Sequence, residues 1–95
     1  MKKYELMYIL FPTLTEEERN TTVSSVEETL KAAGATILST DKWGERKLAY
    51  PIEKKETGFY FLTTFEVDGT KLIDVTAKFN INEQLMRYII VKQGK

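Results

Sequence analysis

The alternation of apolar and polar side chains predicts four extended segments in this chain. Residues 4–11 are almost continuously apolar, as expected for a central strand covered on much of both faces, and Pro12 ends the segment because proline has no N–H for a ladder. Residues 59–67 alternate with a period of two, which is typical of a half-buried strand, and residues 85–92 form a fourth extended segment. Residues 35–52 form the second and longest segment.

That long segment cannot alternate regularly from end to end. Ile37 sets one alternation, whereas Leu48, Tyr50 and Ile52 set the opposite one, so the sequence predicts a register irregularity near Trp43-Gly44. A β-bulge is the usual device for such a shift. Gly58, at the end of the following charged turn, is expected to take a positive φ, which glycine adopts without steric cost.

Two segments have helical signals. Thr15 followed by Glu18 is a capping box, and Gly34 stands where a left-handed residue would end the first helix. The apolar stripe of this helix consists of Val23, Val26, Leu30 and Ala33. A second helix follows the turn at residues 68–70, with Leu72, Val75, Ala77 and Phe79 as its apolar contacts.

The predicted order is therefore βαββαβ, in a single domain covering residues 1–95. Right-handed crossovers place both helices on one face of a four-stranded antiparallel sheet, which is the ferredoxin-like sandwich of the α+β class. The alternation of the third strand predicts that Phe61 and Phe65 face the helices, together with Val26 and Leu30.

Composition restricts the chemistry available to the chain. The sequence has no cysteine and no histidine, which removes disulfides, thiolate metal sites and the commonest general base, so we expect neither an enzyme nor a metal or other cofactor. No apolar run approaches a membrane span and no signal-peptide pattern opens the chain, so a cytoplasmic location is expected. Fourteen basic residues balance fourteen acidic ones. Residues 42–55 nevertheless hold five basic and two acidic residues, a local net charge of +3.

One motif is much more specific than these patterns. The segment Gly44-Glu45-Arg46-Lys47-Leu48-Ala49-Tyr50-Pro51-Ile52, followed by Gly58-Phe59-Tyr60, resembles the signature hairpin of the bacterial small-subunit ribosomal protein six family. The opening Lys3-Tyr4-Glu5, the Gly34-Ala35 junction and the closing Val91-Lys92 also fit, so the resemblance covers essentially the whole chain.

The resemblance implies a structural protein of the small (30S) ribosomal subunit. It implies binding to the central domain of 16S ribosomal RNA, as a heterodimer with ribosomal protein eighteen, and neither a membrane nor a small-molecule substrate as a partner. Members of this family are unusually non-basic for ribosomal proteins, because the partner supplies much of the positive surface. By matching position, the RNA-facing residues would be Lys2, Lys3, Arg46, Lys47, Arg87 and Lys92. The basic segment supports Arg46 and Lys47 independently, through contacts that position phosphates.

The sheet face opposite the helices is predicted to be only half polar. Its apolar members are Met7, Ile9, Tyr60 and Leu62. Because an exposed apolar patch usually marks a partner, we expect this face or its edge to dock the partner ribosomal protein.

Three further interpretations concern single residues in and around the hairpin. Trp43 is interpreted as a packing residue at the strand irregularity and Tyr50 as a core residue. Lys54 and Lys55, at the turn, are interpreted as solubilising side chains.

Three alternatives share the same order of elements. An RNA-recognition-motif domain would stack bases on outward-facing aromatics at Phe59 and Phe61, but these share the apolar parity that should face the helices, and Thr57 replaces the motif's leading basic residue. A small ferredoxin-like hydrolase would need an anion-binding arginine in the loop at residues 11–14, which has none. A regulatory small-molecule module of the same fold stays open as an alternative, although no residues mark a ligand pocket. Asn80 and Asn82 suit turns rather than catalysis.

Overall fold

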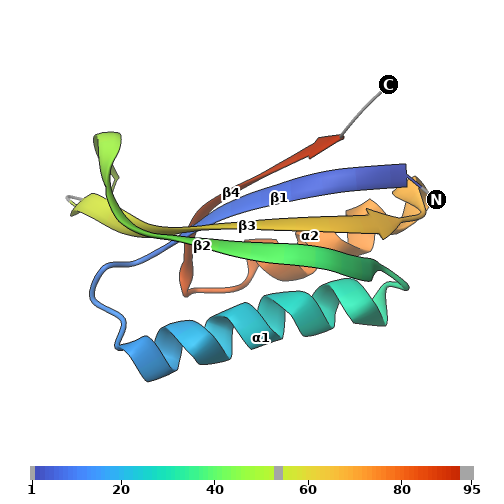
Figure 1. The fold of residues 1–95 in the computed structure, drawn as a ribbon, viewed down its shortest axis with the longest axis horizontal. Coiled ribbons are helices and arrows are strands. Elements are labelled where there is room, and N and C mark those ends of the chain that lie inside the picture. The colour runs from blue at the N-terminus through green and yellow to red at the C-terminus, as the bar shows by residue number, and fades with distance from the viewer. Residues whose placement is uncertain (1, 53–54, 93–95) are drawn as a thin grey trace.

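A computed structural model describes residues 2–52 and 55–92 of the chain. Its elements are β1 (Lys2–Leu10), α1 (Glu16–Ala32), β2 (Thr36–Ile52), β3 (Lys55–Val67), a single 3-10 turn η1 (Gly69–Lys71), α2 (Leu72–Asn80) and β4 (Leu85–Lys92). The four strands form an antiparallel sheet in the order β2-β3-β1-β4, and both helices cover the same face (Figure 1). The predicted ferredoxin-like sandwich is confirmed.

Local signals fix both ends of α1. The Thr15 hydroxyl accepts a hydrogen bond from the Glu18 N–H (3.1 Å), and the Glu18 carboxylate accepts one from the Thr15 N–H (2.8 Å). At the other end Gly34 has φ +90°, its N–H donates to the Lys31 carbonyl, and the Ala35 N–H donates to the Leu30 carbonyl. This pair of bonds is a Schellman motif, which satisfies carbonyls left over at the helix end. Both predicted caps are confirmed.

The core lies between the sheet and the two helices. Phe61 is 5% exposed and Phe65 is fully buried, in one cluster with Val26 and Leu30, so the predicted orientation of β3 is confirmed. The rings of Phe61 and Tyr8 stack with centroids 5.3 Å apart. This packing holds the aromatic side chains of β3 against the helix layer.

Helix α2 contacts the core along a narrower stripe than the sequence predicts. Val75 and Phe79 are buried and Leu72 is partly buried, but Ala77 is exposed and Ile73 is 77% exposed. The prediction that Ala77 contacts the core is wrong. An α-helix turns by 100° per residue, so a residue two positions after Val75 points to nearly the opposite side of the helix. Neither helix in residues 2–52 and 55–92 is long and apolar enough to cross a membrane.

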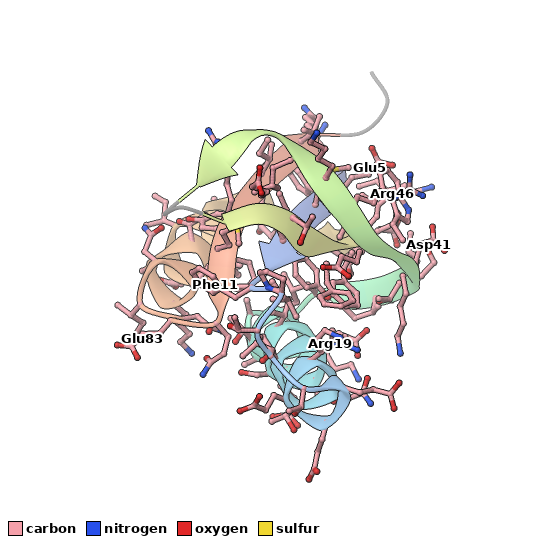
Figure 2. All side chains as sticks on the ribbon, turned by 90° about the vertical axis from the view of Figure 1, so that its left-hand side faces the viewer. Glu5, Phe11, Arg19, Asp41, Arg46 and Glu83 are labelled. Carbon is pink, nitrogen blue, oxygen red and sulfur yellow. The ribbon has the colours of Figure 1, made fainter. Side chains whose placement is uncertain are left out.

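Strand β2 changes register against β3 three times. The shifts fall between Ile37 and Ser39, between Lys42 and Gly44, and between Lys47 and Ile52. The second is the predicted irregularity, and Gly44 has φ +80° there. In Figure 1 the hairpin of β2 and β3 turns away from the helices, and in Figure 2 the end of β2 curves across the opposite face of the sheet. The side chains of Tyr50, Lys54 and Lys55 lie outside the described residues.

Glycine is needed at position 58 for a reason that differs from the prediction. The positive φ values among the described glycines belong to Gly34 and Gly44, so the expectation for Gly58 is wrong. A Cβ on Gly58 would stand 2.4 Å from Ile9 Cγ2 and 3.2 Å from the Leu10 carbonyl oxygen. Gly58 therefore permits β3 to pass close to β1 at the start of the hairpin.

Candidate nucleic-acid and partner interface

The sheet face opposite the helices, which we call the open face, is not covered by either helix. Residues that pair across antiparallel strands point to the same side of a sheet, so the register defines rows of neighbours on this face. The rows are Thr36, Glu66 and Lys3; Ser39, Thr64, Glu5 and Val91; Asp41, Leu62, Met7 and Ile89; Gly44, Tyr60, Ile9 and Arg87; and finally Arg46 and Gly58. Polar and charged residues occupy both ends, and apolar residues occupy the centre.

The apolar centre is exposed mainly on the β4 side. Ile89 is 55% exposed and Val91 is 53% exposed, while Met7, Tyr60 and Leu62 are partly exposed. We call these five residues the apolar patch. The sequence prediction included Met7, Tyr60 and Leu62 but missed Ile89 and Val91. The sequence did contain a signal for both residues. Ile89 and Val91 alternate with the core-facing Tyr88 and Ile90 in β4, so they share the open face with Arg87.

Ile9 has little surface to offer a partner. It is 9% exposed, although its position in β1 belongs to the open face. Its side chain lies against the backbone of Gly58, close to the Met86 side chain, and Leu48 of the curled hairpin is buried without belonging to the helix-side core. Ile9 therefore lies beside the patch, in the row of Tyr60, but is largely covered.

The six basic residues predicted to face RNA are all exposed, but they do not form one cluster. Lys3, Arg46 and Arg87 belong to the open face, whereas Lys2, Lys47 and Lys92 have the opposite parity. Arg46 and Arg87 stand toward the same end, in neighbouring rows on the outer strands β2 and β4. Lys3 stands at the other end, roughly 20 Å along β1. On the open face, the patch thus lies between Lys3 at one end and Arg46 and Arg87 at the other.

Lys2 and Lys92 come together at the end of the sheet near η1. They line an open hollow of about 470 Å³ with Tyr4, Asp68, Gly69 and Thr70. The Asp68 carboxylate accepts hydrogen bonds from the Thr70 N–H and hydroxyl, each 3.0 Å. The hydrogen bond from the backbone N–H is the larger cause of a lowered pKa of Asp68, and the hydrogen bond from the hydroxyl adds to it. The carboxylate of Asp68 therefore stays ionised. The hollow therefore presents two cations and one anion, with a small positive excess.

Trp43 and Arg46 lie together at the second irregularity of β2. The Trp43 side chain is 39% exposed, and the Arg46 guanidinium carbon lies 5.6 Å from the centroid of its ring. Arg46 Nε also donates a hydrogen bond to the Trp43 carbonyl (3.3 Å). The interpretation of Trp43 as a packing residue did not anticipate this much exposure. Figure 2 shows Arg46 on the same side of the molecule as Asp41, the β2 side.

Phe59 and Phe61 of β3, the aromatic residues that an RNA-recognition motif would use, are not available for stacking on bases. Phe61 packs on Tyr8, and the Arg19 guanidinium of α1 lies 3.8 Å from the centroid of the Phe59 ring. Arg19 is held there by a hydrogen bond to the Leu14 carbonyl (2.9 Å), and Figure 2 shows it on the helix layer. The aromatic side chains that an RNA-recognition-motif domain presents on its open sheet face are therefore directed to the helix side here.

The described residues offer little chemistry for catalysis. No group of three or more Asp or Glu side chains in residues 2–52 and 55–92 could hold a metal ion. Tyr8 is a fully buried titratable residue, and its hydroxyl makes no hydrogen bond of good geometry within the described part of the chain. Burial raises the pKa of Tyr8 to about 12, opposed by the neighbouring Thr63 hydroxyl and reinforced by the negative charge of Glu27. Tyr8 therefore stays neutral and serves the core.

A ferredoxin-like sandwich whose open face carries an apolar patch and exposed cations belongs to the class of binding modules. Comparison with known proteins identifies the family. The family model described as Ribosomal protein S6 matches residues 3–92. The chain therefore belongs to the ribosomal protein S6 family, whose members are structural, non-enzymatic proteins of the small subunit of the cytoplasmic ribosome.

Relatives and solved structures agree with this assignment. The small ribosomal subunit protein bS6 of Fusobacterium nucleatum is 62% identical over 93 residues, which cover 98% of this chain and 99% of that protein. The bS6 protein of Azobacteroides pseudotrichonymphae is 39% identical over 95 residues, covering 100% of this chain and 85% of its own. The crystal structure of 30S ribosomal protein S6 from Thermotoga maritima matches with a TM-score of 0.93 at 28% identity, covering 97% of this chain and 87% of that one.

A second structural match concerns the fold alone. The C-terminal domain of the MgtC protein from Mycobacterium tuberculosis has a TM-score of 0.63 at 9% identity, covering 98% of this chain and 88% of that chain. Because one fold hosts unrelated functions, this likeness says nothing about what the chain binds.

Proposed function

We propose that this chain binds the central domain of 16S ribosomal RNA together with ribosomal protein eighteen, as a heterodimer. The observation that supports this most is the arrangement of the open face, where an exposed apolar patch lies between Lys3 at one end and Arg46 and Arg87 at the other. Protein interfaces commonly have an apolar centre and a polar rim. In this proposal the partner protein covers the patch and the RNA contacts the rim.

The apolar patch suits a protein rather than RNA. Ile89 and Val91 expose more than half of their surface to water, and Leu62 and Met7 lie beside Ile89 in one row. Covering such side chains removes apolar area from water at about 25 cal/mol per Å². RNA presents charged phosphates and polar edges to a partner, so it gains little from contact with these aliphatic groups. The proposed docking residues are Met7, Tyr60, Leu62, Ile89 and Val91, together with the largely covered Ile9 beside Tyr60.

The basic residues suit phosphate contacts. Each of the six is exposed, and lysine and arginine at such positions orient a nucleic acid through phosphate oxygens. Because the chain has fourteen basic and fourteen acidic residues, it has no overall positive field that would attract RNA by itself. We therefore expect weak RNA binding by this chain alone and tight binding by the heterodimer, in which the basic partner adds positive surface.

Docking of the partner can be tested at Tyr60. Tyr60→Asp places a charge within the patch, so it is expected to weaken heterodimer formation in a calorimetric titration while thermal unfolding stays cooperative. Ile73→Asp, at a 77% exposed position on α2, is the matched control and should leave the affinity unchanged. Equal affinities for Tyr60→Asp and the original protein would remove this face from the proposal.

Phosphate contacts can be tested at Arg46 and Lys47, which are adjacent in β2 but have opposite parity. Filter binding of the heterodimer to a central-domain fragment of 16S RNA is measured at several salt concentrations, with Arg46→Gln, Lys47→Gln and the double variant. Each lost phosphate contact should weaken binding and flatten the log–log salt slope by about one unit.

The matched control is Lys31→Gln with Lys78→Gln, which removes two exposed charges from the helix layer. The control should leave the affinity close to that of the original protein. If it loses as much affinity as the double variant at Arg46 and Lys47, the effect is one of net charge and the proposed contacts are wrong.

A further inference from the structure

The exposed Trp43 and Arg46 pair on β2 has a geometry that the phosphate contacts of the proposed function do not use. Trp43 is the single tryptophan of the chain, and 39% of its surface is exposed to solvent. The Arg46 guanidinium beside it adds a planar cation at 5.6 Å from the ring centroid.

The backbone holds this pair in place. Trp43 is the extra residue at a register shift, because Lys42 pairs with Phe61 while Gly44 already pairs with Tyr60. Gly44 takes φ +80°, a conformation that other residues adopt only with strain, and open space surrounds its Cα. The hydrogen bond from Arg46 Nε to the Trp43 backbone carbonyl holds the Arg46 side chain beside residue 43, where its guanidinium lies 5.6 Å from the centroid of the indole ring. The pair is thus preorganised before any partner arrives.

The surroundings favour a nucleic acid over a protein at this point. β2 is an outer strand of the sheet, and its other residues on the open face before Gly44 are the polar Thr36, Ser39 and Asp41, so Trp43 stands at a polar edge of the face, one strand away from Tyr60 and Leu62. Lys42 and Lys47 are exposed beside it. The nearby Glu45 carboxylate accepts a hydrogen bond from the Thr57 hydroxyl (2.8 Å), so one of its oxygens already has a partner within the protein.

We propose that Trp43 and Arg46 form a stacking site for one unpaired base of the RNA. Proteins recognise single-stranded RNA by stacking its bases on aromatic rings and on arginine planes. Here the indole face would carry the base, and the Arg46 guanidinium would lie against the base edge or the adjoining phosphate. This inference rests on the proposed function and adds to it a contact that does not depend on charge alone.

The single tryptophan supplies a direct measurement. Fluorescence of Trp43 is followed while the heterodimer is titrated with the central-domain fragment of 16S RNA, and anisotropy of labelled RNA gives the affinity in parallel. Because ribosomal protein eighteen can contribute its own tryptophan, the same titration with Trp43→Phe serves as the blank. Stacking is expected to quench Trp43 fluorescence in proportion to RNA bound.

Variants separate stacking from charge. Trp43→Leu keeps an apolar side chain without an aromatic face and is expected to weaken RNA binding roughly 5- to 100-fold, as for the loss of one stacked base. Its salt slope should stay unchanged, because no phosphate contact is lost. Trp43→Phe should lie between Trp43→Leu and the original protein. Arg46→Lys keeps the positive charge but loses the planar guanidinium group. It should therefore weaken RNA binding without changing the dependence of the affinity on salt concentration.

The possible failures are distinguishable. If the RNA binds with no quenching and Trp43→Leu binds equally well, the stacking site is wrong and the proposed function stands. If ribosomal protein eighteen alone changes the Trp43 signal and RNA adds nothing, the partner protein covers Trp43 and the inference is again overturned. If the original heterodimer fails to bind the RNA fragment, the proposed function itself fails and the stacking site with it.

Discussion

Replacing Phe61 by alanine tests the packing on which the orientation of the whole sheet depends. Phe61 is 5% exposed and its ring stacks on Tyr8 at 5.3 Å with an interplanar angle of 13°. A buried aromatic side chain hides about 150–250 Å² from water. At about 25 cal/mol per Å², the smaller area corresponds to about 3–4 kcal/mol once the retained methyl group is allowed for.

The stacked pair increases that loss. Aromatic pairs contribute about 0.5–1.5 kcal/mol beyond the area they bury. Relaxation of the neighbouring side chains reduces the cavity left behind, so we expect Phe61→Ala to lower the free energy of unfolding by about 3–5 kcal/mol. Domains of this size are stable by about 5–15 kcal/mol, so the variant should be only marginally folded at room temperature.

Urea denaturation followed by far-UV circular dichroism gives the free energy of unfolding. Fluorescence is a poor probe here, because Trp43 is already 39% exposed in the folded protein. Phe61→Leu should lose less than Phe61→Ala and provides a variant that stays measurable. Ile73→Ala, at a 77% exposed position, should stay within about 0.5 kcal/mol of the original protein. A loss below about 1 kcal/mol for Phe61→Ala would show that the ring is exposed and available for bases.

Three further outcomes are expected. Gly58→Ala should destabilise the protein by about 1–3 kcal/mol in urea denaturation, because its Cβ would meet Ile9 Cγ2 at 2.4 Å; an unchanged midpoint would show that the strands separate freely there. Thr15→Ala removes the hydroxyl that caps α1 and should cost about 0.5–2 kcal/mol, whereas Thr21→Ala on the exposed face of α1 should change little. The pKa of Tyr8 is raised from 10.0 to about 12 in the folded state, because the buried phenol is favoured in its neutral form. The stability that this preference contributes is therefore fully present below pH 10 and is lost as the pH rises through 12. Between pH 8 and 11 the original protein should lose about 1.4 kcal/mol more stability than Tyr8→Phe, and equal losses would show that the phenol is solvated.

Local sequence signals were sufficient to predict the helices, the strands and most of the residues that face the core. The ends of α1 follow from Thr15, Glu18 and Gly34, because capping bonds join residues within a few positions of one another. The burial of Phe61 and Phe65 follows from alternation, because side chains on a strand point to opposite faces in turn. Both kinds of signal are local, so they can be read without knowing how the strands pair.

The candidate site was predictable only in part. The exposure of Arg46, Lys47 and the other predicted cations agrees with the sequence, since charged side chains avoid the core. Whether they contact RNA remains the subject of the proposal. Trp43 was recognised as standing at a strand irregularity, but its exposure beside Arg46 depends on where the bulge aims the side chain, which the sequence does not specify.

Only the tertiary structure decided which residues of the open face are accessible. Ile9 and Ile89 both have the parity of that face, yet Ile9 is 9% exposed and Ile89 is 55% exposed. The difference arises because Gly58, nearly fifty positions after Ile9, lets the backbone of β3 pass against the Ile9 side chain, while β4 forms the outer edge of the sheet. Alternation assigns a residue to a face, but its exposure depends on segments distant in sequence that cross that face.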